Sequence, residues 1–68
     1  MLGVREGQRF RKRGDHRHIW VIDAIVQRKD RPGHYAILVS EDGNSEEEVD
    51  LALLADVNLY QPMQAGES

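Results

Sequence analysis

The stretch HIWVIDAIVQRKDRPGHYAILVSE, residues 18–41, decides the fold class of this 68-residue chain. Its two apolar runs are rich in β-branched and aromatic residues, which suit a half-buried pleated surface. They flank Arg31-Pro32-Gly33, a turn signal in which proline presets the first dihedral angle and glycine supplies a positive φ. The stretch therefore predicts two successive strands of a meander, at residues 18–29 and 34–41.

Turn signals on either side extend the meander. Arg13-Gly14-Asp15 and Asp42-Gly43-Asn44 predict further strands at residues 8–13, 46–51 and 58–61. Residues 51–56 are good helix formers but are long enough for barely one turn, so we expect a helical turn near residues 52–56. The prediction is an all-β domain over residues 8–62, with an N-terminal segment (1–7) and a flexible C-terminal tail (63–68).

Several short patterns carry a resemblance to known proteins: Gly7-Gln8-Arg9-Phe10, Trp20-x-Ile22-x-x-Ile25, His34-x-Ala36-x-Leu38 and Leu51-x-x-Leu54-x(4)-Leu59-Tyr60. Together with the order of strands, the chain resembles small bacterial proteins of uncharacterised function with an SH3-like (Tudor-like) barrel, over roughly residues 6–62. The resemblance implies a small five-stranded SH3-like barrel with one helical turn before the last strand. It implies no site residues, because this fold carries many unrelated binding functions.

Alternation along the strands predicts which side chains face inward. Trp20 and Ile22 share one face, and a bulge near Asp23-Ala24 would bring Ile25 back to it. The other predicted core residues are Phe10, Ala36, Leu38, Val49, Leu51, Leu54 and Leu59.

The same register makes the outer face of the two long strands apolar as well. Its predicted outward residues are Ile19, Val21, Tyr35, Ile37 and Val39. A meander strand normally alternates apolar-in with polar-out, and a large exposed apolar patch marks a binding surface. The alternatives are a reversed register, or chain termini that cover this face.

Charge is distributed unevenly along the chain. Residues 1–35 hold all nine Lys and Arg against four acids, a net charge of +5, whereas residues 36–68 hold eight acids and no base, a net charge of −8. The acidic run Glu46-Glu47-Glu48 is either a solvated edge or a second part of a protein interface. We predict that the basic and acidic groups form separate poles that do not pair within one molecule.

The basic residues gather around the first two hairpins. They are Arg9, Arg11, Lys12, Arg13, Arg17, Arg28, Lys29 and Arg31. Small β-barrels bind nucleic acids with spaced cations and stacking aromatics, but a charged edge that discourages strand-to-strand aggregation is the commoner use of such residues.

Other classes of function find little support. The chain has no cysteine, no phosphate-binding glycine loop and no paired nucleophile and base, and so small a domain lacks room for a substrate pocket. We therefore expect no enzyme, cofactor or small-molecule substrate. His16, His18 and His34 are interpreted as loop or surface residues rather than metal ligands. No apolar run spans a bilayer and no signal peptide is visible, so a cytoplasmic location is the default expectation.

The sequence thus leads to a protein-binding or assembly module, acting on a protein partner or on itself through the outer face. Nucleic-acid binding through the two basic hairpins is the alternative.

Overall fold

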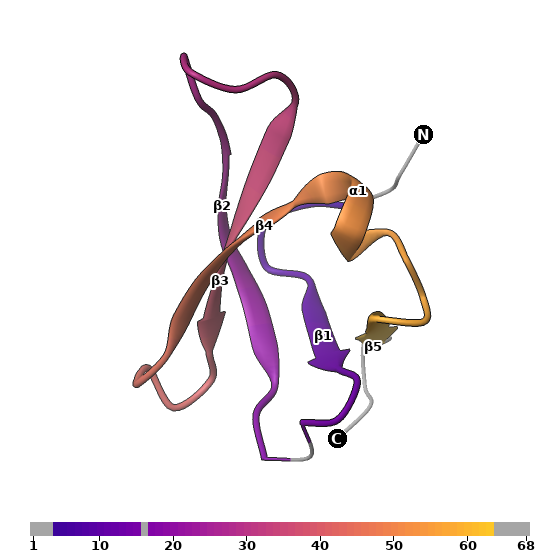
Figure 1. Ribbon diagram of the computed structural model, residues 1–68. Helices are drawn as coiled ribbons and strands as arrows, with labels where there is room; N and C mark the ends of the chain where they lie inside the picture. The colour runs from indigo at the N-terminus through magenta and orange to yellow at the C-terminus, as the bar shows by residue number, and fades with distance from the viewer. Residues whose placement is uncertain (1–3, 16, 64–68) are drawn as a thin grey trace.

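The computed structural model describes residues 4–15 and 17–63. Five strands form a single antiparallel sheet, and one turn of helix precedes the last strand (Figure 1). The elements are β1 (Arg9–Lys12), β2 (Trp20–Gln27), β3 (His34–Ser40), β4 (Glu46–Asp50), α1 (Leu51–Leu54) and β5 (Tyr60–Met63). The order across the sheet is β4-β3-β2-β1-β5, so β1 lies between β2 and the C-terminal strand. The predicted all-β class, strand number and helical turn are confirmed.

The predicted turns and the predicted bulge are present. Gly14, Gly33 and Gly43 all adopt positive φ angles, the conformation that glycine reaches without steric cost. In the pairing of β2 with β3, the register shifts between Ile22 and Ala24. Such a shift bends the strand and increases its twist. It lets the first part of β2 pair with β1 while the remainder extends with β3 as a long hairpin (Figure 1).

The core lies on the inner face of this sheet. Trp20, Ile22, Ala36 and Leu38 are buried, as alternation predicts. They pack with Phe10, Val49, Leu54 and Tyr60, while Ile25 and Leu51 are partly buried against them. The helical turn begins at Asp50, whose carboxylate accepts a hydrogen bond from the backbone N–H of Ala52 at 2.8 Å. This N-cap holds α1 so that Leu54 enters the core.

One predicted core residue is wrong. Leu59 is 40% exposed, and Tyr60, at 6%, takes the inward position. The backbone N–H groups of Leu59 and Tyr60 both donate to the carbonyl of Asp56, so residues 56–59 form a turn. The strand therefore begins at Tyr60 and ends at Met63, two residues later than predicted, and the inward position moves by one residue.

The sheet curls until its acidic edge meets the other side. Glu47 of edge strand β4 accepts a hydrogen bond from Lys12 Nζ of β1 at 2.8 Å, and one from the Tyr60 hydroxyl of β5 at 3.4 Å. Residues 35 positions apart are thus joined by side chains across the open end of the sheet. Among the described residues, the paired strands do not include β4 with β5, so side chains make this contact without a backbone ladder.

Candidate interaction surfaces

Four of the five apolar residues predicted on the outer face of β2 and β3 lie there, and the fifth, Ile19, precedes β2 and is partly exposed. Tyr35, Ile37 and Val39 are partly exposed, and they alternate with the buried Ala36, Leu38 and Ser40. On β2, Val21, Ala24 and Val26 lie opposite Val39, Ile37 and Tyr35 respectively. The register is therefore not reversed. The one described element outside the sheet, α1, lies on the inner side, where Leu54 joins the core.

One row of paired residues crosses all five strands on this outer face. It runs Met63, Arg9, Val21, Val39 and Glu46, from β5 to β4. Because paired residues in an antiparallel sheet share a face, these five side chains lie side by side. The face is therefore basic on β1, apolar on β2 and β3, and acidic on β4.

An ionic cluster covers one end of the apolar strip. Glu48 lies opposite Ile37 on β4. Arg28 Nη2 donates to Glu48 Oε1 at 2.6 Å, and Arg31 Nη2 donates to Glu48 Oε2 at 2.8 Å. Arg31 also stacks over the Tyr35 ring, 4.5 Å from its centroid. The hydrogen bond from Arg28 is the main cause that lowers the pKa of Glu48. Two arginines from the β2–β3 loop thus neutralise one member of the acidic run.

A second set of ion pairs joins the basic and acidic parts of the chain. Arg9 Nε lies 3.0 Å from Glu41 Oε2, and Lys12 Nζ lies 2.8 Å from Glu47 Oε2. The hydrogen bond to Glu47 is the largest cause that raises the pKa of Lys12. The prediction of separate charge poles is therefore wrong. Curling of the sheet brings the side chain of Glu47 on β4 to Lys12 on β1, so residues distant in the sequence pair in space.

The three glutamates of the acidic run have three different environments. Glu47 pairs with Leu38 in the ladder and so lies on the inner side, where it contacts Lys12. Glu48 is held by the two arginines, and Glu46 is exposed on the outer face. All three glutamates were predicted as interface candidates. Of these, Glu46 lies beside the apolar strip and takes no part in the ion pairs of Glu47 and Glu48.

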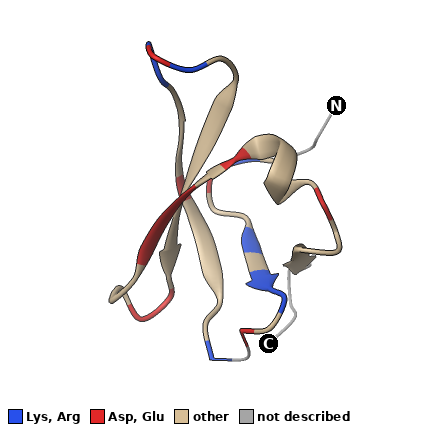
Figure 2. Cartoon of the chain, viewed as in Figure 1, with Lys and Arg blue, Asp and Glu red and all other residues tan. Residues whose placement is uncertain are grey.

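The basic residues proposed for nucleic-acid binding do not form one track. Figure 2 shows Lys and Arg at the tip of the β2–β3 hairpin and, far from it, along β1 and the loop that follows. Four of the eight candidates, Arg9, Lys12, Arg28 and Arg31, are engaged by glutamates. For Arg11, Arg13, Arg17 and Lys29, no ion pair is found among residues 4–15 and 17–63.

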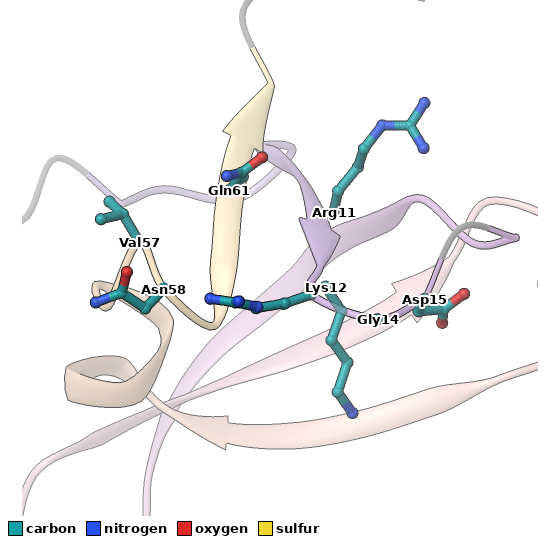
Figure 3. A pocket seen from close by; sticks show the side chains of 8 residues that line it. Arg11, Lys12, Gly14, Asp15, Val57, Asn58 and Gln61 are labelled. Atoms are coloured by element: carbon teal, nitrogen blue, oxygen red, sulfur yellow. The ribbon is translucent and has the colours of Figure 1, made fainter.

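Two of these remaining cations line a cleft beside the first hairpin. The cleft has a volume of about 270 Å³ and lies between residues 11–15 and a wall made of Val57, Asn58 and Gln61. Figure 3 shows Arg11 and Lys12 leaving β1 on opposite sides, as strand alternation requires. Lys12 also lines the cleft, but its Nζ donates a hydrogen bond to Glu47.

Asp15 stabilises the side of this cleft that residues 11–15 form. Its carboxylate accepts hydrogen bonds from the backbone N–H groups of Arg17 and His18, at 3.0 and 3.1 Å, and lies 3.0 Å from His18 Nδ1. These contacts lower the pKa of Asp15 to about 2, and the hydrogen bond from the Arg17 backbone is the largest cause. Arg13-Gly14-Asp15 is therefore a structured turn, as the sequence predicts.

Sequence reasoning missed a second apolar surface. Leu53, Val57 and Leu59 are the exposed large hydrophobic residues of the described chain, at 52%, 64% and 40%. Val57 also forms part of a groove of about 250 Å³, whose other lining residues are Val4, Gln8, Phe10, Leu54, Ala55 and Pro62. The spacing of Leu51 and Leu54 is the signal that was available, because three residues of separation place both on the inner side of a helical turn and leave Leu53 outside.

No group of three or more His, Asp or Glu side chains within residues 4–15 and 17–63 is arranged to hold a metal ion. His16 lies outside the described residues, and His34 is exposed at the start of β3. In the same part of the chain, no helix has the length and apolar character needed to cross a membrane.

Comparison with known proteins finds no matching family model, no similar curated protein and no similar solved structure.

Proposed function

We propose that this chain is a non-enzymatic binding or assembly module, built on an SH3-like barrel, that binds a protein through the outer face of β2 and β3. The observation that carries the proposal is the apolar character of that face. Val21, Val39 and Ile37 occupy outward positions on two central strands, although the core on the other side is complete without them. When a partner removes such apolar side chains from water, the burial lowers the free energy of the complex.

The framing of this strip supports the same function. Polar and charged side chains surround its apolar centre, with Arg9 and Glu41 at one end and Glu48 with its two arginines at the other. An apolar centre with a polar rim is the usual anatomy of a protein interface. The rim fixes the orientation of the partner, and the centre supplies most of the affinity.

A photo-crosslinking experiment tests the proposal. A benzoylphenylalanine at Val21 should form adducts in the cell of origin, and the substitution Val39→Glu in the same chain should abolish them. Leu53→Glu, an equally polar change on the second apolar surface, should leave the adducts unchanged. Adducts that survive Val39→Glu but disappear with Leu53→Glu would overturn the proposal in favour of the second surface. Circular dichroism of each variant checks that the fold is retained.

Nucleic-acid binding remains the second candidate, and the cleft lined by Arg11 and Arg13 is what favours it. A titration with mixed-sequence DNA and RNA separates the two functions. Phosphate binding weakens steeply as salt rises because counterions are released, whereas an apolar interface is much less sensitive. Nucleic-acid binding that is strong at low salt, weakens steeply as salt rises and disappears with Arg11→Ala would support the cleft. Adducts lost with Val39→Glu support the outer face.

A further inference from the structure

We propose that the occupant of the outer face is a second copy of this chain, packed face to face about a two-fold axis that runs parallel to the strands. This inference rests on the proposed function and names its partner. The order of side chains across the sheet carries it: a basic strand, two apolar strands and an acidic strand, all on one face.

A two-fold axis parallel to the strands, placed between β2 and β3, reverses the order of strands in the second copy. Strand β1 then lies over β4 of the other copy, and β2 lies over β3. In the row that crosses the sheet, Val21 meets Val39 of the second copy, and Arg9 meets Glu46. In a two-fold symmetric interface every contact occurs twice, so each complementary pair contributes twice to the stability of the dimer.

The other symmetric arrangement is disfavoured by charge. An axis within the sheet plane but perpendicular to the strands places β1 over β1 and β4 over β4, which brings like charges together. Pairing between the exposed edges of two β4 strands has the same defect, because Glu46 and Glu48 lie along that edge. Charged residues on an edge strand are a common means of preventing such pairing.

Two charged side chains on this face are placed to form ion pairs with the second copy. Glu46 is exposed on β4, and Arg11 is partly exposed on β1, one row beyond Arg9. No ion pair of either residue is found among residues 4–15 and 17–63. Arg28 and Arg31 already pair with Glu48, so Glu48 lies at the rim of the interface and adds no electrostatic attraction between the copies. The size of the chain gives a reason for self-association, because so small a domain buries only about 60% of its unfolded surface.

Sedimentation velocity on the full chain, over a range of concentrations at low and moderate salt, tests the inference. The wild-type chain should form dimers in a concentration-dependent manner. Arg11→Glu and Glu46→Arg should each raise the dimer dissociation constant by roughly tenfold, because each reversal enters the symmetric interface twice. Arg5→Glu and Asp56→Arg make the same changes of charge outside the sheet and should have little effect.

Two combinations report on the geometry itself. The double variant Arg11→Glu/Glu46→Arg should dimerise more tightly than either single variant, without reaching the wild type because Arg9 is unchanged, and an equimolar mixture of the two single variants should form heterodimers. Loss of dimer in the double variant would overturn the parallel axis, because a like-over-like arrangement gains nothing from the exchange. A wild-type chain that stays monomeric at every concentration would overturn the second copy as occupant. Adducts at Val21 of a mass other than twice the chain would then leave the proposed function standing with a different partner.

Discussion

The two faces of the sheet are built from the same strands but are completed in different ways. The inner face is closed by the chain itself, because β5 and α1 supply Tyr60 and Leu54, which are buried with the apolar core residues of the other strands. The outer face is also apolar along β2 and β3, but within the described chain its residues Val21, Ile37 and Val39 are only partly buried. Apolar alternation alone therefore does not separate a core from an interface. The elements available to cover each face make that separation.

The largest effect should come from the residue that completes the inner face. Tyr60→Ala should reduce the free energy of unfolding by about 3–5 kcal/mol, as expected for removal of a buried aromatic ring. Its neighbour Leu59 is the matched control, since Leu59→Ala removes a side chain that is 40% exposed and should cost less than about 1 kcal/mol. Urea denaturation of both variants measures the difference. Equal losses would place Leu59 in the core after all.

Adjacent residues of β3 compare the two faces directly. Leu38→Ala should cost about 2–5 kcal/mol because Leu38 is fully buried. Ile37→Ala, on the outer face, should cost about 1 kcal/mol in the monomer, since Ile37 is already partly in water. The two free energies of unfolding should be measured at a concentration low enough to exclude association. If Ile37→Ala were as costly as Leu38→Ala in the monomer, the outer face would be a second core rather than an interface.

The ion pair that joins the sheet edges should have a smaller effect. Lys12→Met keeps most of the aliphatic stem and removes the contact with Glu47, so it should cost about 1 kcal/mol or less. Because the pKa of Lys12 is raised in the folded state, this contribution is present at neutral pH and is lost as pH rises through that folded value. The difference in stability from wild type should therefore shrink at high pH and in strong salt. Arg13→Met is the control, and a difference that persists under both conditions would show that packing, not charge, is responsible.

The smallest effect concerns the turn beside the cleft. The pKa of Asp15 is lowered to about 2, so its stabilising contribution is complete above the ordinary carboxylate value near 4 and is lost as pH falls toward about 2. Asp15→Asn should therefore reduce the dependence of the free energy of unfolding on pH between about 4 and 2. Asp23→Asn, a change at an exposed residue of the bulge, should leave that dependence unchanged. A carbon-detected NMR titration of Asp15 gives the midpoint directly. A midpoint near 4 would show that the hydrogen bonds of this turn are not formed in solution.

Local signals accounted for the strands, the turns and the bulge. Glycine and proline marked the turns because they adopt backbone angles that other residues avoid, and alternation placed Trp20, Ile22, Ala36 and Leu38 inside. The end of the chain was less predictable. Val57, Asn58 and Leu59 are compatible with a strand by composition, but the turn at Asp56 holds them and moves the last strand by two residues.

The sequence alone predicts five strands, the inner and outer residues of β2 and β3, and the unequal charge of the two halves of this protein. Tertiary structure decided which charges meet. The curl of the sheet brings Glu47 to Lys12, and the length of the β2–β3 hairpin lets Arg28 and Arg31 reach Glu48. Strand periodicity is a local property of two residues per repeat, and so it can be read along the chain. Pairing of distant charges depends on twist and closure, which arise from all five strands together.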